Sequence, residues 1–420
     1  LQEQGAQIMI GHAAENLPAE ASLVVYSSAV PSENPEFQEA RLRGIPIVRR
    51  AEVLAELMRL KYGVAVAGSH GKTSTTSMVG AILEEAGLDP TVVIGGIVKS
   101  IGTGGKLGKS NYLVAESDES DRSFLILKPT VAVVTNIDKE HLQAYKSLED
   151  LEHSFEKFIN AVPFYGLAVL CADDPKVSDL AARYTKRMMT YGMSPQADIR
   201  ADNVVQQRST TSFDVLVRNE FRFRIDLPLP GRHLMVNSLA AIAVAMEFGV
   251  SDAQIVSGLN SFAGVGRRLE TIGVVQGVTV VDDYGHHPTE IKASIQALRD
   301  GFGSELNRLH VVFQPHRYSR TQDSFVDFIQ SFRECDRLIT TEIYSAGESP
   351  IEGISGQVLS DAINHPEKEF CSTLDECRTA ITQGLSQGDV VLCCGAGSIG
   401  GFAQTIVADL EKSLTSERAA

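Results

Sequence analysis

A short glycine-rich loop between a predicted strand and a predicted helix constrains the fold of this chain more than any other feature. The apolar run YGVAVA, Tyr62–Ala67, predicts a buried strand, and Thr75–Ala86 predicts a helix with its apolar residues on one face. The loop between them contains GSHGKT, residues 68–73. Backbone N–H groups in such a loop, together with the positive end of the following helix, bind phosphate. The pattern therefore predicts a nucleotide-binding unit of a parallel α/β fold.

Lys72 and Thr73 supply the expected chemistry of this loop. The lysine can reach the terminal phosphates of a nucleotide, and the threonine hydroxyl can ligate the Mg²⁺ ion that accompanies them. The general pattern G-x-x-x-x-G-K-[ST] has a glycine where this chain has Val66, so the loop is a shortened G-x-x-G-K-T. The alternative is an ordinary strand–turn–helix with a surface lysine, which the position of the lysine at this junction disfavours.

The length and charge of the chain narrow the classes of protein it can belong to. A chain of 420 residues is too long for one hydrophobic core, so two or three domains are expected. The net charge of −15 argues against a general nucleic-acid binder, because backbone phosphates require a basic surface. No stretch approaches the ~20 apolar residues of a membrane span. The six cysteines show no C-x-x-C pairing, which is typical of reduced thiols in the cytoplasm.

Alternating strand and helix signals divide the chain into three α/β segments. Residues 1–59 predict part of a doubly wound unit, and the first residues do not have the pattern of a signal peptide. Because the sequence lacks an initial methionine and begins as if in the middle of a domain, we expect this domain to be truncated at its start. Residues 60–264 carry the phosphate loop and add antiparallel strands over Ile199–Leu227, where polar and apolar residues alternate. Residues 265–420 predict a second doubly wound unit. The predicted strands are Gln7–Ile10, Leu23–Tyr26, Pro46–Val48, Tyr62–Ala67, Tyr112–Glu116, Val131–Asn136, Leu167–Cys171, Val278–Asp282, Leu309–Gln314, Arg337–Thr341 and Asp389–Cys393. The predicted helices are Glu36–Arg43, Ala51–Leu60, Thr75–Ala86, Leu148–Asn160, Met235–Phe248 and Asp252–Ser261.

Candidate metal ligands follow two of the predicted central strands. Glu116 ends one strand, and His141 lies on the loop after the next. The carboxyl ends of parallel strands meet at one edge of a sheet, where ligands bind. A carboxylate there is a natural Mg²⁺ ligand, and a histidine can bind metal or phosphate. The neighbouring acidic residues are expected to form a solvated loop: Asp118, Glu119 and Asp121.

Two clusters of charged residues follow neighbouring strands of the third segment. The stretch DDYGHHPTEI, residues 282–291, contains two aspartates, a tyrosine and two histidines. The stretch FQPHRYSRT, residues 313–321, places Arg317 and Arg320 on one helical face if this part is helical. Two guanidinium groups there could hold a carboxylate, with surface salt bridging as the alternative. Arg268, in the sequence GRRLE, could reach phosphates.

Two charged α/β units facing one cleft suit a particular reaction class. An enzyme of this kind activates a carboxylate with ATP and then attacks it with a small amine. The γ-phosphate would move to the carboxylate as an acyl phosphate, with Mg²⁺ and Lys72 neutralising the developing charge. Such chemistry depends mainly on positioning, so the two units are expected to close over the reactants.

The motifs resemble those of the Mur ligase family, in order and spacing, over essentially the whole chain. The loop GSHGKTST is similar to the family's GTxGKT loop, and AESDESD, VVTNIDKEH, VDDYGHHPTE, FQPHRYSRT and AGE-PI are similar to further motifs. DDYGHHP together with QPHRYSRT resembles the alanine-adding members. The resemblance implies a Rossmann-like N-terminal domain, present in part, for the UDP end of the substrate. It also implies a central P-loop ATPase domain with a mainly parallel sheet, and a C-terminal Rossmann-like domain for the incoming amino acid.

The same resemblance implies a reaction and roles for individual residues. The reaction would join L-alanine to UDP-N-acetylmuramate in the cytoplasm, with ATP and Mg²⁺, in a monomer or a homodimer. The candidate metal ligands are Thr73, Glu116 and His141. The candidate ATP-binding residues are Gly68, Ser69, His70, Gly71, Lys72, Thr73, Ser74, His233 and Asn237. The candidate substrate-binding residues are Ser27, Ser28, Arg268, Tyr284, His286, Arg317 and Arg320. The candidate catalytic residues are Lys72, Glu116, His141, His286 and Asp283.

The sequence departs from the family pattern at a few positions, and the motifs leave more than one function to be considered. Leu234 stands where the family usually has an asparagine, and Gln143 stands where it usually has an acidic residue. The N-terminal glycine-rich loop with which the family usually binds uridine diphosphate is missing from this sequence. Within the family, the rival is the ligase that attaches a recycled peptide to the same nucleotide sugar. A folate polyglutamate ligase is disfavoured by VDDYGHHPTE. From another class, the rival is a nucleotide-gated binding protein without turnover, against which the aspartate pair and the two arginines argue.

Overall fold

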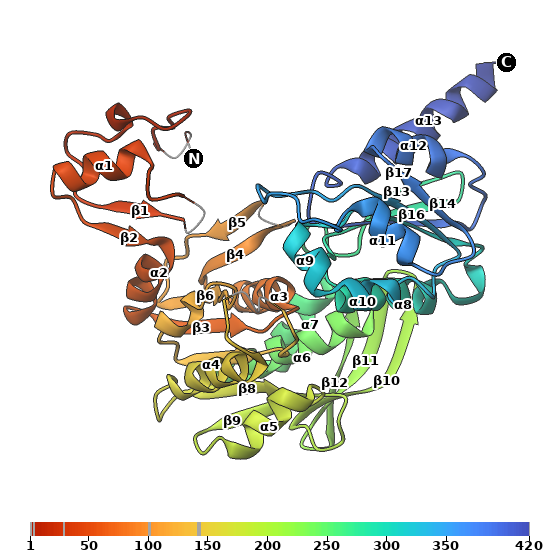
Figure 1. Cartoon of the computed structure of the whole chain (residues 1–420). Helices are drawn as coiled ribbons and strands as arrows, with labels where there is room; N and C mark the ends of the chain where they lie inside the picture. The colour runs from red at the N-terminus through yellow and green to blue at the C-terminus, as the bar shows by residue number, and fades with distance from the viewer. Residues whose placement is uncertain (1, 3–4, 28–29, 100–101, 141–143, 420) are drawn as a thin grey trace.

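Ten strands among the described residues form one long sheet through the middle of the molecule (Figure 1). The computed structural model describes residues 2, 5–27, 30–99, 102–140 and 144–419. The strands are β3 (Tyr62–Ala67), β4 (Thr91–Val98), β5 (Thr103–Lys106), β6 (Tyr112–Glu116), β7 (Val131–Val134), β8 (Leu167–Cys171), β9 (Met188–Gly192), β10 (Ile199–Gln207), β11 (Thr210–Val217) and β12 (Glu220–Leu227). Their order is β12-β11-β10-β9-β8-β7-β3-β6-β4-β5. Neighbours from β10 to β4 pair in parallel, and the expected antiparallel strands β11 and β12 extend one edge.

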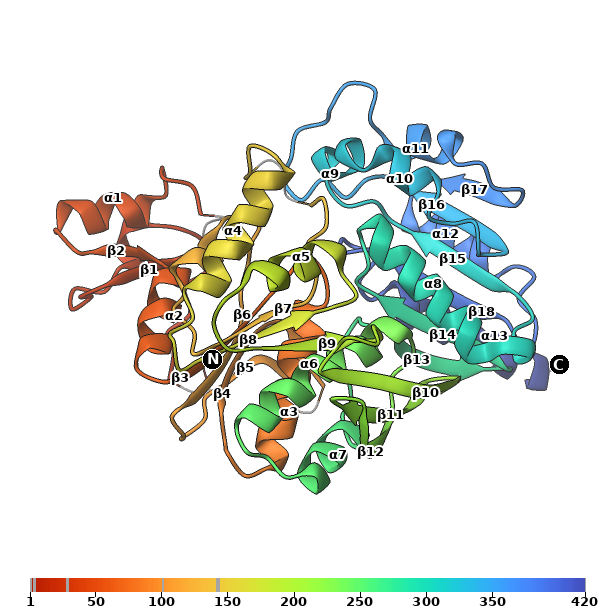
Figure 2. The same cartoon turned by 90° about the horizontal axis from the view of Figure 1, so that it is seen from below.

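Helices cover both faces of this central sheet. Because both faces are covered, the middle strands are apolar throughout, and the residues of β3 from Val64 to Ala67 are fully buried. One face packs against α3 (Lys72–Glu85), α6 (Arg232–Glu247) and α7 (Asp252–Asn260). Figure 2 shows α4 (Leu148–Asn160) and α5 (Pro175–Arg183) on the opposite face. Helix α4 also contacts the 3₁₀ turn η3 (Ser123–Ile126).

A second sheet lies in the C-terminal part of the described chain, with strand order β13-β14-β18-β15-β16-β17. The strands are β13 (Glu270–Val275), β14 (Val278–Asp283), β15 (Leu309–Phe313), β16 (Arg337–Thr341), β17 (Lys368–Cys371) and β18 (Val390–Cys394). Among the described residues, neighbouring strands of this sheet pair in parallel, except that β13 pairs antiparallel with β14. The helices are α8 (Pro288–Phe302), α9 (Tyr318–Asp323), α10 (Phe325–Ile329), α11 (Gly356–Ala362), α12 (Leu374–Thr382) and α13 (Phe402–Ala419), with the 3₁₀ turn η4 (Gly303–Glu305).

The N-terminal segment contributes a small parallel pair of strands. These are β1 (Val24–Tyr26) and β2 (Ile47–Arg49), with α1 (Pro35–Leu42), α2 (Arg50–Arg59) and the 3₁₀ turn η2 (Ala14–Asn16). Helix α2 leads directly into β3. The expected class, an α/β protein with a mainly parallel central sheet and a second doubly wound sheet, is confirmed.

Some of the predicted elements are wrong or incomplete. Gln7–Ile10 is not a strand: Ile10 is 95% exposed, and this segment pairs with no strand in the described ranges. A strand requires a partner for its backbone groups, and an apolar run cannot supply one. The strands β4, β5, β9, β13 and β17 were not predicted. The first two contain glycine pairs, in TVVIGGIV and TGGK, which weaken the strand signal.

No helix within the described residues combines the length and the apolar character that crossing a membrane would require. In the same part of the chain, all the cysteines are buried and lie in no disulfide. Cys393 and Cys394 lie in β18, as expected for core residues.

Candidate active site between the central and C-terminal units

The glycine-rich loop follows β3, whose neighbours in the sheet are β6 and β7. Gly68 has φ +137°, and a Cβ there would lie 2.0 Å from Thr135 Oγ1, so only glycine fits. Gly71 has φ +83°, and a Cβ there would lie 2.7 Å from Asn237 Oδ1. Helix α3 begins at Lys72, three residues before its predicted start. The first turn of a helix leaves backbone N–H groups unpaired, which suits a phosphate ligand.

Lys72 is held by a buried carboxylate. Its Nζ donates to Glu119 Oε2 at 2.7 Å and Oε1 at 2.9 Å, and to two backbone carbonyls of the loop at 2.6 and 3.1 Å. Glu119 is 0% exposed, so the expectation that it belongs to a solvated loop is wrong, whereas Asp118 and Asp121 are exposed as expected. Burial raises the pKa of Glu119 to about 7, and Lys72 opposes that rise. A phosphate bound by the loop would compete with Glu119 for the ammonium group.

Thr73 and Glu116 form a pair of oxygen donors beside the loop. The Thr73 hydroxyl donates to Glu116 Oε2 at 3.0 Å and lies 3.1 Å from Oε1. The backbone N–H of Gly95, in the unpredicted strand β4, donates to Glu116 Oε2 at 2.8 Å and so orients the carboxylate. Carboxylate and hydroxyl oxygens are the donors that Mg²⁺ prefers, so the residues present fit this ion.

Contacts around His70 join the central unit to α8. His70 Nε2 lies 3.0 Å from Asp138 Oδ2, and its Nδ1 lies 3.4 Å from Glu290 Oε1. The same Asp138 oxygen accepts a hydrogen bond from Thr289 Oγ1 at 2.7 Å. Burial by itself would lower the pKa of His70, but hydrogen bonds and proximity to Asp138, Glu290 and Glu140 raise it to about 10. At neutral pH the imidazole is therefore a cation among carboxylates at the boundary between the units.

A cavity of about 400 Å³ lies behind the phosphate loop, between α6 and α8. His233, Leu234 and Asn237 of α6 line it together with Lys176. Burial lowers the pKa of His233 to about 4, so its imidazole is neutral at physiological pH. The cavity is lined by amide, imidazole and charged side chains around a neutral His233, and such groups can hydrogen-bond the edge of a heterocycle.

Tyr284 and His286 project from the loop between β14 and α8. The ring centroids lie 5.3 Å apart, and the Arg268 guanidinium lies 5.0 Å from the centroid of the Tyr284 ring. Asp283 is buried beneath this loop and accepts hydrogen bonds from Leu269 N at 2.8 Å and Gly285 N at 2.7 Å. Both oxygens of the Asp283 carboxylate therefore accept hydrogen bonds that hold the backbone of the loop in place. Burial raises its pKa.

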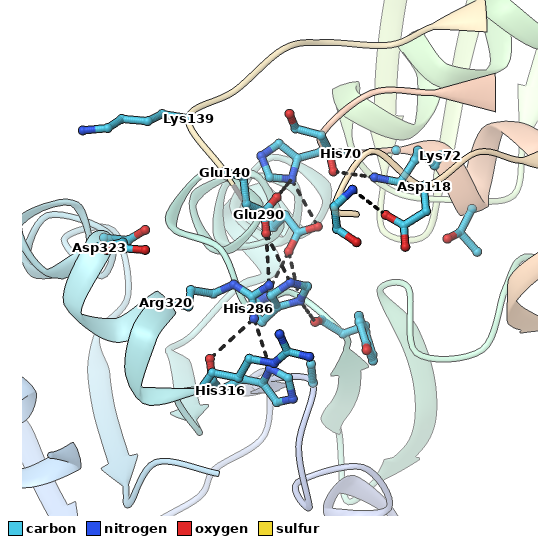
Figure 3. A pocket seen from close by; sticks show the side chains of 18 of the residues that line it. His70, Lys72, Asp118, Lys139, Glu140, His286, Glu290, His316, Arg320 and Asp323 are labelled. Atoms are coloured by element: carbon cyan, nitrogen blue, oxygen red, sulfur yellow. Dashed lines mark hydrogen bonds and ion pairs between the residues drawn. The ribbon is translucent and has the colours of Figure 1, made fainter. Parts of the chain in front are cut away.

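Arg320 and His316 lie across the cleft from the phosphate loop (Figure 3). Arg320 Nη1 lies 3.0 Å from His316 Nδ1, and Nη2 donates to Glu140 Oε1 at 3.2 Å. Arg317 is the N-cap residue of α9, with φ 71°, so the two arginines do not share a helical face, although both line the same cavity. Burial lowers the pKa of His316 to about 4, and Arg320 contributes to this shift.

The structure brings most of the predicted site residues to these two adjoining cavities. The larger, of about 770 Å³, is lined by Ser69, His70, Gly71, Lys72, Thr73, Glu116, Arg268, Tyr284, His286, Arg317 and Arg320. The smaller is lined by His70, Gly71, Ser74, His233, Asn237, Arg268 and Asp283. Gly68 lines neither cavity, and Ser27 is exposed after β1 in the N-terminal unit. Ser28 and His141 lie outside the described residues.

Sequence reasoning missed four carboxylates that organise the site: Glu119, Asp138, Glu140 and Glu290. Glu290 had a local signal, because it occupies the third position of α8 and its side chain accepts a hydrogen bond from His287 N. Asp138 and Glu140 had only their position after a predicted strand. For Glu119, the surrounding acidic sequence predicted a solvated loop, whereas the side chain is buried.

Three sequence profiles of the Mur ligase family match the chain. The profile described as Mur ligase family, catalytic domain matches residues 1–62. The Mur ligase middle domain matches residues 66–245, and the Mur ligase, glutamate ligase domain matches residues 267–397. Together the matches extend over both sheets and both cavities.

Individual proteins of known name are similar over nearly the whole length. A UDP-N-acetylmuramate–L-alanine ligase from a Geobacter species is 50% identical over 414 residues, which cover 98% of this chain and 89% of the relative. The crystal structure of UDP-N-acetylmuramate-alanine ligase from Thermotoga maritima has a TM-score of 0.82 at 28% identity, covering 98% of this chain and 90% of that one. A murein peptide ligase from Psychrobacter arcticus has a TM-score of 0.68 at 23% identity, covering 97% of this chain and 90% of that one. This last likeness shows the shared fold alone.

Proposed function

The chain belongs to the Mur ligase family, and we propose that it joins L-alanine to the carboxylate of UDP-N-acetylmuramate in an ATP-dependent step of peptidoglycan precursor synthesis. One observation carries the proposal: a single cavity has a phosphate loop on one wall and an arginine pair on the other. The first wall suits ATP, and the second suits the carboxylate of an amino acid. The 50% identity to a ligase of this name supports the choice of amino acid and nucleotide sugar.

We assign one substrate to each segment of the chain. Residues 60–264 would hold ATP, residues 265–420 the amino acid, and residues 1–59 the UDP end of the sugar nucleotide. A cavity of about 700 Å³, lined by Tyr26, Arg49 and Asp121 among others, lies between the first segment and the central unit and supports the last assignment. Ser27 and Ser28 would contribute there. The reduced cysteines agree with a reaction in the cytoplasm.

The first chemical step forms an acyl phosphate. An oxygen of the substrate carboxylate attacks the γ-phosphorus, the bond to the β-phosphate oxygen breaks, and ADP leaves. Lys72 holds the transferred phosphoryl oxygens, since its ammonium lies over the loop that binds the phosphates. Thr73 and Glu116, with His141, would hold Mg²⁺, which neutralises phosphate charge when bound. His233 and Asn237 would contact the adenine in the smaller cavity.

The second step forms the amide bond. The alanine nitrogen attacks the acyl carbon, a C–N bond forms, and the bond from carbon to the phosphate oxygen breaks. Arg317 and Arg320 would hold the carboxylate of alanine. His286 Nδ1 lies 3.1 Å from the carbonyl oxygen of Tyr284, which can only accept, so Nδ1 carries the hydrogen. Nε2, which lies 3.7 Å from Glu140 Oε1, is then the ring nitrogen that would receive the proton of the amine.

Phosphate release from ATP tests the proposed function. With UDP-N-acetylmuramate present, we expect release to depend on added L-alanine and to be matched by formation of the alanyl product. A tripeptide in place of L-alanine should support little release, in keeping with the 50% identity to an L-alanine ligase. Faster release with the tripeptide would favour a peptide ligase. Nucleotide binding without amine-dependent release would favour a binding protein.

Replacing Glu116 with glutamine is expected to raise the Mg²⁺ concentration for half-maximal activity by about tenfold or more, because the substitution removes the charge of a metal-ligating oxygen. Activity measured against Mg²⁺ at fixed ATP checks this. Asp118→Asn is the matched control, since Asp118 lines the same cavity but is exposed and does not contact Thr73. An unchanged Mg²⁺ requirement in the Glu116 variant would contradict the metal assignment.

A further inference from the structure

The arginine assigned to the amino acid already holds a carboxylate from the opposite unit. Glu140 Oε1 lies 3.2 Å from Arg320 Nη2 and 3.7 Å from His286 Nε2 (Figure 3). Glu140 precedes His141 on the loop after β7, whereas Arg320 lies on α9 and His286 after β14. One side chain of the central unit therefore contacts two groups that the proposed reaction needs for alanine.

Two nitrogens of the Arg320 guanidinium already have partners among the described residues. Its Nη1 faces His316 Nδ1 at 3.0 Å, and its Nη2 faces Glu140. The side chains of Arg320 and Glu140 are 12% and 7% exposed, so water and salt weaken this ion pair less than a surface pair. Arg317, in contrast, has no hydrogen bond or ion pair from its guanidinium to any described residue. An amino-acid carboxylate that pairs with both Nη nitrogens of Arg320 in the planar, bidentate arrangement must therefore displace Glu140 from Nη2.

We propose that Glu140 is an internal competitor for the amino-acid site, a carboxylate that occupies Arg320 until the carboxylate of the substrate replaces it. The inference rests on the proposed function for the identity of that substrate. Glu140 then sets the apparent affinity for the amino acid, because binding is reduced by the fraction of molecules in which Arg320 is occupied. Glu140 is a residue that tunes substrate affinity and takes no part in bond making.

The same geometry also suits an opposite role for Glu140, in which it strengthens the binding of alanine, and the test must distinguish the two roles. A carboxylate beside Arg320 could hold the ammonium group of alanine, and removing it would then weaken binding. Propionate distinguishes the two roles, since it has the carboxylate and methyl group of alanine but no ammonium group. If Glu140 is a competitor, it weakens the binding of both alanine and propionate. If Glu140 instead binds the ammonium group, it strengthens the binding of alanine and has no group to bind in propionate.

The test is an NMR titration of the nucleotide-free chain with propionate and, separately, with L-alanine. Glu140→Gln keeps the size of the side chain and removes its charge, and Glu140→Ala removes its hydrogen bond as well. We expect both variants to bind both ligands about tenfold more tightly than the unaltered chain, the factor for a site that is free about one-tenth of the time. The gain should disappear when Arg320→Lys is added to Glu140→Gln, because the lysine offers no planar fork.

Two variants control for other effects of removing Glu140. Thr289→Val removes a different contact between the units, the 2.7 Å hydrogen bond to Asp138, and leaves Arg320 untouched. Asp323→Asn removes one negative charge from the same cavity without touching Arg320. Neither should tighten propionate binding. An equal gain in Thr289→Val would assign the effect to loosening of the units, an equal gain in Asp323→Asn would assign it to overall charge, and either result overturns the proposal.

Unchanged or undetectable propionate binding in both Glu140 variants also overturns the proposal, as does weaker alanine binding. Failure of the proposed function is a separate result. The unaltered chain could release no phosphate with L-alanine while Glu140→Gln gained affinity for propionate. That result would support the role of Glu140 as a competitor and contradict the assignment of L-alanine as the substrate. Unfolding midpoints of each variant, matched to that of the unaltered chain, show that the titrations compare folded proteins.

Discussion

Replacing Lys72 with alanine is expected to lower the ligation turnover at saturating ATP by about 10²–10³-fold, the typical cost of losing one charge-stabilising contact to a transition state. The ammonium group lies over the loop, within 2.6 Å of one of its carbonyls, and is the cation positioned to meet the γ-phosphate. Initial rates of product formation, measured with all substrates saturating, check the prediction. A variant that kept more than about a tenth of the turnover would contradict the phosphate-binding role of this loop.

The buried partner of Lys72 calls for a control on folding. Removing the ammonium leaves Glu119 without its counter-ion, and an unpaired buried carboxylate destabilises the fold. The pKa of Glu119 is already raised to about 7 by burial, and loss of Lys72 raises it further, so the carboxyl group becomes neutral at physiological pH. Glu119→Gln mimics that neutral form. We expect Glu119→Gln alone to retain most activity, and Lys72→Ala with Glu119→Gln to fold and remain inactive. Urea unfolding midpoints separate lost stability from lost chemistry.

Replacing Arg320 with lysine is expected to raise the KM for L-alanine by about tenfold or more, even though the charge is kept. Arg320 faces two partners at once, His316 through Nη1 and a carboxylate through Nη2, and a single ammonium group cannot reproduce both directions. Because the amine attacks only after the acyl phosphate has formed, the KM for ATP should change little. Positional isotope exchange in ATP, which reports acyl-phosphate formation without alanine, should largely survive.

Arg333→Lys is the matched control for this substitution, since Arg333 is an exposed arginine of the same unit outside both cavities. It should leave every kinetic constant unchanged. If Arg320→Lys instead weakened the binding of ATP or UDP-N-acetylmuramate and left the KM for alanine unchanged, Arg320 would face a phosphate. The amino-acid pocket would then have to lie elsewhere along the cleft.

The sequence by itself determined the elements whose signals are local. The strands β3, β6, β8 and β16 and the helix α4 have the predicted bounds, because runs of apolar residues and the 3.6-residue period reflect burial of one contiguous segment. The phosphate loop was equally readable, since the glycine positions, Lys72 and Thr73 lie within a few residues of one another. Motif order identified the family for the same reason, because each motif is short and continuous.

Only the tertiary structure decided which charges meet. Glu119 stands in an acidic stretch, yet it is buried because Lys72, 47 positions away, neutralises it. The unpredicted strand β4 brings Gly95 N–H to Glu116, and the pairing of Glu140 with Arg320 joins residues 180 positions apart. Gln7–Ile10 shows the opposite case, in which an apolar run without a neighbouring strand forms no strand. A local pattern reports whether a segment is buried, whereas the partner of a buried charge or a strand edge is set by contacts that the folded chain makes over long sequence distances.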